Sequence, residues 1–127
     1  MPRGTKKKVL LVDDESDMGL IFKRILEKNN IVVDYHSSPL EALRNFKPNF
    51  YDLAILDIKM PQMNGTKLYI ELRKLDQKMP VCSISAYEMT ISELREILPD
   101  YITNCFMKKP IPKETLLTKV QQILCET

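Results

Sequence analysis

The chain has 127 residues, of which 44% are hydrophobic and 28% charged, as is ordinary for one globular domain with a sizeable core. No apolar run reaches the ~18 residues of a membrane span and no secretory signal opens the chain, so we expect no membrane contact and a cytoplasmic location. Four of the 19 basic residues lie in the first eight positions, and the other 15 face 17 acidic ones. The net charge of +2 therefore comes from a basic tail at residues 1–7 and its neighbour Lys8, which argues against direct nucleic-acid binding.

The first predicted strand, residues 9–12, is entirely apolar and ends at the acidic run Asp13-Asp14-Glu15. Apolar residues then recur at helical spacing and predict an amphipathic helix from residue 16 to about residue 28. The β-branched segment 31–35 predicts a second strand. The residues that recur at this spacing are Met18, Ile21, Phe22, Ile25 and Leu26.

A serine N-cap at Ser38, a proline at the next position and Glu41 three residues after the cap predict the start of a short second helix. The apolar run at residues 53–56 stops at a single carboxylate, Asp57. Such a run between turn signals is typical of a strand buried on both faces, as in parallel sheets. A third helix is expected from about residue 64 to 75, with Leu68, Leu72 and Leu75 on one face.

Residues 81–85 predict a fourth strand, and a capping box at residues 90–93 opens a helix to about residue 98. Residues 105–107 predict a short fifth strand, which Lys109-Pro110 follows. A last amphipathic helix runs to the end of the chain. Its apolar positions are Leu116, Leu117, Val120, Ile123 and Leu124.

Strands that alternate with helices in this way predict one α/β domain over residues 1–127, with a parallel sheet covered on both faces. Right-handed crossovers favour the doubly wound strand order 2-1-3-4-5, a flavodoxin-like three-layer sandwich. In this order strands 1 and 3 are neighbours at the topological switch point, where open sheets bind ligands. We therefore expect Asp13, Asp14 and Asp57 to meet at one edge of the sheet.

Three adjacent carboxylates need a proton or a cation, because two charges about 4 Å apart repel by roughly 4 kcal/mol at an effective dielectric near 20. An oxygen-only cluster favours a hard ion, Mg²⁺ or Mn²⁺, and Mg²⁺ commonly keeps positions for water and phosphate. Ser85 at the end of strand 4 and Lys109 after strand 5 offer a hydroxyl and an ammonium to a transferred phosphoryl group. The sequence thus predicts a metal-dependent phosphoryl site.

Four motifs stand in order at the ends of predicted strands: LLVDDE, LAILDIKMP with a following NG, SISA and FMKKP. With them the chain resembles the receiver domains of two-component response regulators from about residue 8 to residue 126. The resemblance implies that Asp57 is the phosphoacceptor and that a sensor histidine kinase is the donor. It also implies a signalling protein rather than a metabolic enzyme, which catalyses only its own phosphorylation and autodephosphorylation.

The resemblance further implies a set of ligands for Mg²⁺. Asp14 and Asp57 would bind the ion directly, and Asp13 mostly through water. The main-chain carbonyl of Lys59 would complete the ligands that the protein supplies.

The phosphoryl group has its own implied contacts. The Ser85 hydroxyl and the amide of Ala86 would bond its oxygens, and Lys109 would pair with them. The Lys109–Pro110 peptide bond is cis in relatives.

Phe106 occupies the family's switch position, where Ser85 moving toward the phosphoryl group would open space for the ring. The face formed by helix 4, strand 5 and helix 5 would then be the output surface for a downstream protein, and it is compatible with a homodimer. Phe106 equally fits the description of a core aromatic without a switching role, and both interpretations stay open.

Two other function classes match part of this pattern. A haloacid-dehalogenase-type phosphatase also uses an aspartate nucleophile and Mg²⁺, but its first strand carries DxDGT, which Asp13-Asp14-Glu15-Ser16 does not fit. A pseudo-receiver would act by protein docking without phosphorylation. Such domains usually lack one of the five key residues, and none is missing here.

Cys82, Cys105 and Cys125 are widely spaced and form no C-x-x-C, which predicts reduced core thiols. The receiver pattern extends almost to the last residue given, and we expect no effector domain within residues 1–127. We therefore expect either a single receiver domain that acts by protein–protein contact or a fragment of a longer regulator.

Overall fold

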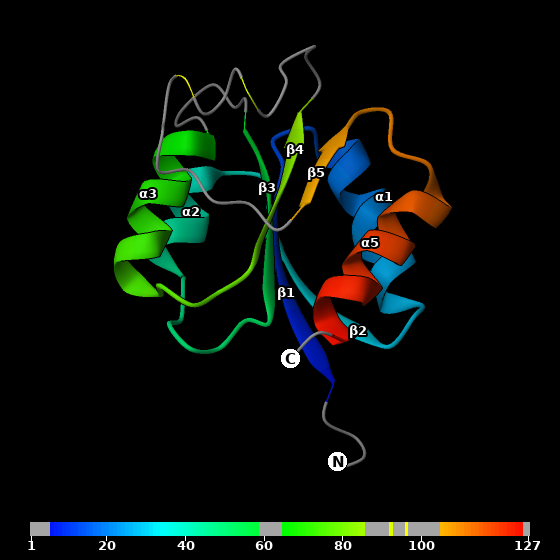
Figure 1. Ribbon diagram of the computed structural model, residues 1–127, viewed down its shortest axis with the longest axis horizontal. Coiled ribbons are helices and arrows are strands. Elements are labelled where there is room, and N and C mark those ends of the chain that lie inside the picture. The colour runs from blue at the N-terminus through cyan, green and yellow to red at the C-terminus, as the bar shows by residue number, and fades with distance from the viewer. Residues whose placement is uncertain (1–5, 59–64, 86–91, 93–95, 97–104, 126–127) are drawn as a thin grey trace.

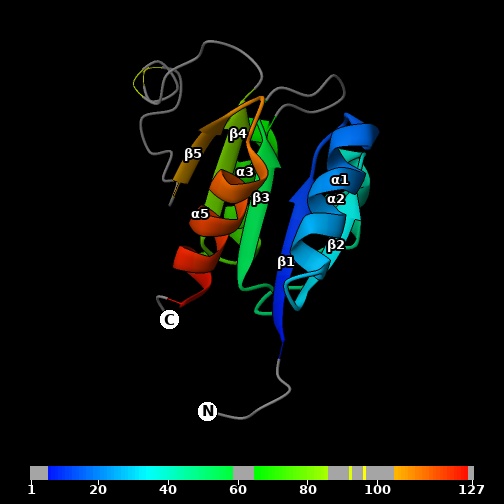
Figure 2. The same ribbon diagram turned by 90° about the vertical axis from the view of Figure 1, so that its right-hand side faces the viewer.

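The computed structural model describes residues 6–58, 65–85, 92, 96 and 105–125. Five parallel strands form one sheet in the order β2-β1-β3-β4-β5, which confirms the predicted α/β class and strand order. Figure 2 shows the arrowheads of the strands at the same end of the sheet. The strands are β1 (Lys7–Val12), β2 (Ile31–His36), β3 (Leu53–Asp57), β4 (Val81–Ser85) and β5 (Cys105–Lys108).

Helices cover both faces of this sheet, with α2 and α3 on one side and α1 and α5 on the other (Figure 1). None of the helices in the described part of the chain is long and apolar enough to cross a membrane. The predicted start of α2 is confirmed, because the Glu41 N–H donates to Ser38 Oγ at 3.3 Å. The helices are α1 (Ser16–Glu27), α2 (Pro39–Arg44), α3 (Gly65–Leu75) and α5 (Lys113–Cys125).

Two hydrophobic clusters, one on each face, enclose the central strands. Successive side chains of a strand point to opposite faces. Val9 and Leu11 of β1 thus pack on the α1/α5 side, whereas Leu10 and Val12 pack on the α2/α3 side. All four side chains are fully buried, as are the four apolar residues of β3. The continuous apolar runs in the sequence therefore do mark strands buried on both faces.

Two residues of the predicted apolar helix faces are exposed. Ile21 is 52% exposed, because it lies beside the buried stripe of α1 that contains Phe22 and Leu26. Leu75 is 47% exposed at the last position of α3. The basic tail is also shorter than predicted, since Lys7 is the first residue of β1. Only residues 92 and 96 of the helix expected at 90–98 are described, so that helix stays a prediction.

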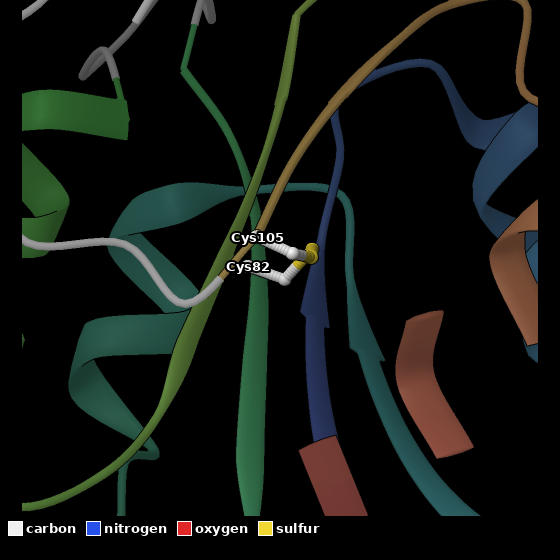
Figure 3. The surroundings of a disulfide bond; sticks show 2 residues. All are labelled: Cys82 and Cys105. Carbon is white, nitrogen blue, oxygen red and sulfur yellow. A yellow bond between two sulfur atoms is a disulfide. The ribbon is translucent and has the colours of Figure 1, made fainter. Parts of the chain in front are cut away.

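The prediction of reduced core thiols is wrong for two of the three cysteines. Parallel register places Cys82 of β4 opposite Cys105 of β5, and the structure joins them in a disulfide bond. Their Cα atoms are 4.6 Å apart, inside the range of about 4.4–6.8 Å that disulfides adopt. Figure 3 shows both side chains leaving the strands in the same direction. Cys125 is a free thiol but is exposed rather than in the core.

Candidate functional site

Three carboxylates meet at the carboxyl edge of the sheet. β1 and β3 are neighbours, and Val12 of β1 lies opposite Leu56 of β3. Asp13 and Asp57, which are the next residues of the two segments, therefore lie side by side at the carboxyl edge of the sheet. One oxygen from each of Asp13, Asp14 and Asp57 lies within 4.8 Å of the other two. Asp13 and Asp57 are almost fully buried, and Asp14 is half-buried. The predicted meeting of these three residues is confirmed.

Lys109 brings a positive charge into this cluster from the end of β5. Its main-chain N–H donates to the Ser85 carbonyl at 2.8 Å, which fixes the start of its side chain beside β4. Nζ then lies 3.0 Å from Asp57 Oδ2 and 3.1 Å from Asp13 Oδ1, and the side chain is only 7% exposed. The peptide bond to Pro110 is cis, as the resemblance implies.

Glu15 also contacts Lys109, and sequence reasoning gave it no role. Its carboxylate forms an ion pair with Lys109 Nζ from the solvent side, where the Glu15 side chain is 55% exposed. Its N–H donates to Asp13 Oδ1 at 2.9 Å just before α1 begins. The acidic run Asp13-Asp14-Glu15 is the signal that pointed here, but the sequence did not show which of the acids faces Lys109.

Burial controls the protonation of the two adjacent aspartates. Loss of solvation raises the pKa of Asp13 to about 6, although hydrogen bonds from the Glu15 N–H and from Lys109 oppose the rise. Burial also raises the pKa of Asp14, and the charge of Asp57 adds to this effect. For Lys109, burial favours a lower pKa, but hydrogen bonds to Glu15, Asp13 and Asp57 outweigh it and raise the pKa. The cluster thus holds more negative charge than one ammonium balances.

The donor set fits a hard divalent cation. Asp13 Oδ2 is buried and lies 2.9 Å from Lys109 Nζ, yet it accepts no hydrogen bond from the part of the chain described here. A carboxylate oxygen that is paired only with an ammonium and lies beside two further carboxylates is suited to Mg²⁺ or to a water of its coordination shell. Lys59 and Ala86, whose main-chain groups are predicted to complete the site, lie outside the described residues.

Ser85 and Phe106 lie at the neighbouring strand ends. Ser85 is the last residue of β4 and is 1% exposed. Phe106 of β5 stands opposite Ser83 of β4 and packs, half-buried, against the cluster on the α2/α3 side. This position agrees with a core aromatic, and the switching role of Phe106 stays a prediction.

The curated relatives of this chain are about twice as long as the chain itself. The transcriptional regulatory protein PrrA of Mycobacterium tuberculosis is 32% identical over 123 residues, covering 94% of this chain and 51% of PrrA. The chain thus spans about half the length of the curated relatives it matches. Because PrrA is named a transcriptional regulator, the expectation that no nucleic acid is involved finds no support among the relatives.

Solved structures share the whole fold. The non-phosphorylated HemR receiver domain from Leptospira biflexa has a TM-score of 0.85 at 26% identity, covering 96% of this chain and 97% of that one. A CheY-like receiver domain protein from Methanospirillum hungatei JF-1 has a TM-score of 0.82 at 28% identity, covering 96% of each chain. Residues 9–121 match the model of the response regulator receiver domain. With this match, the strand order and the acidic edge, the chain belongs to the receiver domain family of two-component response regulators.

Proposed function

We propose that this chain is a phosphorylatable receiver in which Asp57 accepts a phosphoryl group from a sensor histidine kinase with the help of Mg²⁺. One observation carries the proposal: the Asp57 carboxylate is buried at the carboxyl edge between two other carboxylates and Lys109 Nζ at 3.0 Å. This arrangement combines a nucleophilic oxygen, a set of ligands for a hard cation and a cation for the developing negative charge.

The transfer that we propose is a single exchange at phosphorus. An Asp57 carboxylate oxygen attacks the phosphohistidine phosphorus, the P–N bond breaks, and the imidazole leaves on the kinase. Asp57 then carries an acyl phosphate. Lys109, which already contacts Asp57 Oδ2, would follow the charge onto the phosphoryl oxygens, and the Ser85 hydroxyl and the Ala86 amide would bond the others.

Bound Mg²⁺ would supply the positive charge that the excess of carboxylates lacks. Asp14 and Asp57 would bind the ion directly, Asp13 mostly through water, and the carbonyl of Lys59 would add the last protein ligand. Asp13 Oδ2, the buried oxygen without a hydrogen bond from the described residues, supports this arrangement. The proposed autodephosphorylation would use the same site, with water as the acceptor.

The output would pass from Ser85 to Phe106 and to the surface formed by β5, α5 and the helix predicted at residues 90–98. That surface would contact a downstream protein, a second copy of the chain, or the rest of a longer regulator. A cytoplasmic location belongs to the same proposal.

The test is the intact mass of the protein after incubation with acetyl phosphate, with and without Mg²⁺. We expect one phosphoryl adduct in the wild type that requires Mg²⁺ and is absent from Asp57→Asn. Asp52→Asn is the matched control, because Asp52 lies just before the first residue of β3, at the other end of the strand from Asp57. Its carboxylate accepts the Lys8 N–H and is not part of the cluster around Lys109. If phosphorylated histidine kinases also leave the folded wild type unmodified, the pseudo-receiver interpretation replaces this one.

A further inference from the structure

The N–H and the carbonyl of Asp13, in the acidic turn after β1, both form hydrogen bonds to residues of β2. The Asp13 N–H donates to the His36 carbonyl at 3.2 Å. The Tyr35 hydroxyl donates to the Asp13 carbonyl at 2.7 Å. β2 is the outer strand beside β1, and Tyr35 stands opposite Leu11, two residues before Asp13. A side chain from outside the carboxylate cluster thus holds the peptide that links Asp13 to Asp14.

Gly19 provides the space that Tyr35 occupies. It is buried in the second turn of α1, and a Cβ at this position would lie within 3.0 Å of the Tyr35 ring and its hydroxyl oxygen. Real Cβ atoms essentially never approach other atoms so closely. The ring therefore lies against the bare backbone of α1, and this contact fixes where its hydroxyl ends.

The position of this peptide matters for the ligands on either side of it. The Asp13 side chain accepts the Glu15 N–H at 2.9 Å and faces Lys109, while Asp14 presents the next carboxylate. A rotation of the peptide between Asp13 and Asp14 would move both carboxylates relative to Asp57. Oxygen ligands around Mg²⁺ need near-ideal octahedral geometry, so small displacements weaken binding.

We propose that Tyr35, seated on Gly19, is a positioning residue that holds the Asp13–Asp14 turn in the geometry that binds Mg²⁺. This role rests on the proposed function, since it concerns the same metal site. Tyr35 acts through the Asp13 carbonyl and contacts none of the reacting atoms. Its hydroxyl, rather than its ring, carries the role, because Phe would keep the packing of the ring against the α1/α5 cluster.

The test compares Tyr35→Phe with Tyr51→Phe in the full chain. Tyr51 is the matched control, because its hydroxyl donates to Asp34 Oδ2 at 2.7 Å and its ring belongs to the cluster on the other face of the sheet. Titration calorimetry with MgCl₂ should give a dissociation constant about fivefold higher for Tyr35→Phe, the value of one ordinary hydrogen bond. The constant of Tyr51→Phe should equal that of the wild type.

A second variant disturbs the bond between the Tyr35 hydroxyl and the Asp13 carbonyl by changing the residue on which the ring packs. Gly19→Ala places a methyl group where the Tyr35 ring lies, so the ring must shift from the position in which its hydroxyl bonds the Asp13 carbonyl. We expect weaker Mg²⁺ binding of similar size, even though Ala favours the helix more than Gly does. Equal Mg²⁺ constants for the wild type and Tyr35→Phe would overturn the proposal, and so would equal weakening in Tyr51→Phe.

A metal-free measurement separates this inference from the proposed function. Amide hydrogen exchange of Asp13 should be about fivefold faster in Tyr35→Phe and unchanged in Tyr51→Phe, because only the first variant frees the turn. Unchanged exchange at Asp13 would overturn the positioning role whatever the metal does. If the wild type bound no Mg²⁺ at all, the proposed function would fail, while faster exchange at Asp13 would still support the hold of Tyr35 on the turn.

Discussion

Asp13 and Asp76 are both buried carboxylates, at 0% and 7% exposure, but their hydrogen-bond partners and neighbouring charges differ. Asp76, just after α3, accepts the Asn49 N–H on Oδ2 at 2.9 Å and the Lys78 N–H on Oδ1 at 3.2 Å. Asp13 lies beside the carboxylates of Asp14 and Asp57, and its Oδ2 is paired with Lys109 Nζ at 2.9 Å but accepts no hydrogen bond from the described chain. A buried carboxylate with both oxygens bonded to the backbone holds loops together, whereas one that faces other carboxylates and a lysine can also serve a ligand.

Replacing Asp76 by Ala should produce a large loss of stability and little else. The N–H groups of Asn49 and Lys78 would lose their acceptors, so we expect the free energy of unfolding to fall by about 3 kcal/mol. Urea unfolding measures this fall. Mg²⁺ binding and phosphorylation of the folded protein should be unchanged, and a loss of Mg²⁺ affinity would contradict the division between the two carboxylates.

Reduction of the Cys82–Cys105 bond changes stability without touching either carboxylate. The cysteines are 23 residues apart, and opening a loop of that length should lower the free energy of unfolding by about 3 kcal/mol. Urea unfolding with and without a thiol reductant gives the value. Cys125→Ser is the control, since that thiol is free and exposed. Equal stability of the oxidised and reduced proteins would mean that the bond does not constrain the unfolded chain.

The pH dependence of metal-free stability should reveal the burial of the Asp13 carboxylate. The pKa of Asp13 is raised from 3.8 to about 6, so the folded state binds this proton more tightly than the unfolded chain. Stability should therefore fall as the pH rises from about 4 to about 6, by on the order of 3 kcal/mol, and stay level for this group at higher pH. Thermal unfolding in EDTA across this range measures the slope.

Two controls accompany this pH experiment. Asp13→Asn should remove the slope, because the amide does not titrate. Saturating Mg²⁺ should also reduce it, since the ion favours the ionised carboxylates. If Asp13→Asn and the wild type had the same metal-free slope between pH 4 and 6, the raised pKa of Asp13 would be contradicted.

Replacing Asp14 by Asn should give the smallest change in stability. The metal-free protein should become more stable, whereas Asp76→Ala should make it less stable. Asp14 is half-buried beside Asp57, and removing its charge relieves repulsion that solvent partly screens. We expect a gain of about 1 kcal/mol in the metal-free protein. Calorimetric titration should show weaker Mg²⁺ binding in the same variant. A loss of stability without metal would mean that Asp14 has a structural role like that of Asp76.

Much of this protein follows from local sequence patterns. The all-apolar run before Asp57 predicted a strand buried on both faces, and the serine cap at Ser38 predicted the start of α2. Alternation of such elements, combined with the handedness of crossovers, led to the strand order and so to the meeting of Asp13, Asp14 and Asp57. Local periodicity was sufficient to predict these strands and helices, because the backbone geometry of each imposes its repeat within a few residues.

Only the tertiary structure decided which distant side chains touch. The disulfide of Cys82 and Cys105 depends on the register of β4 against β5, and the bond from Tyr35 to Asp13 depends on the bare surface of Gly19. The exposure of Ile21 similarly depends on how α1 is rotated against the sheet. Register and rotation are set by the packing of the whole core, so no short stretch of sequence contains them.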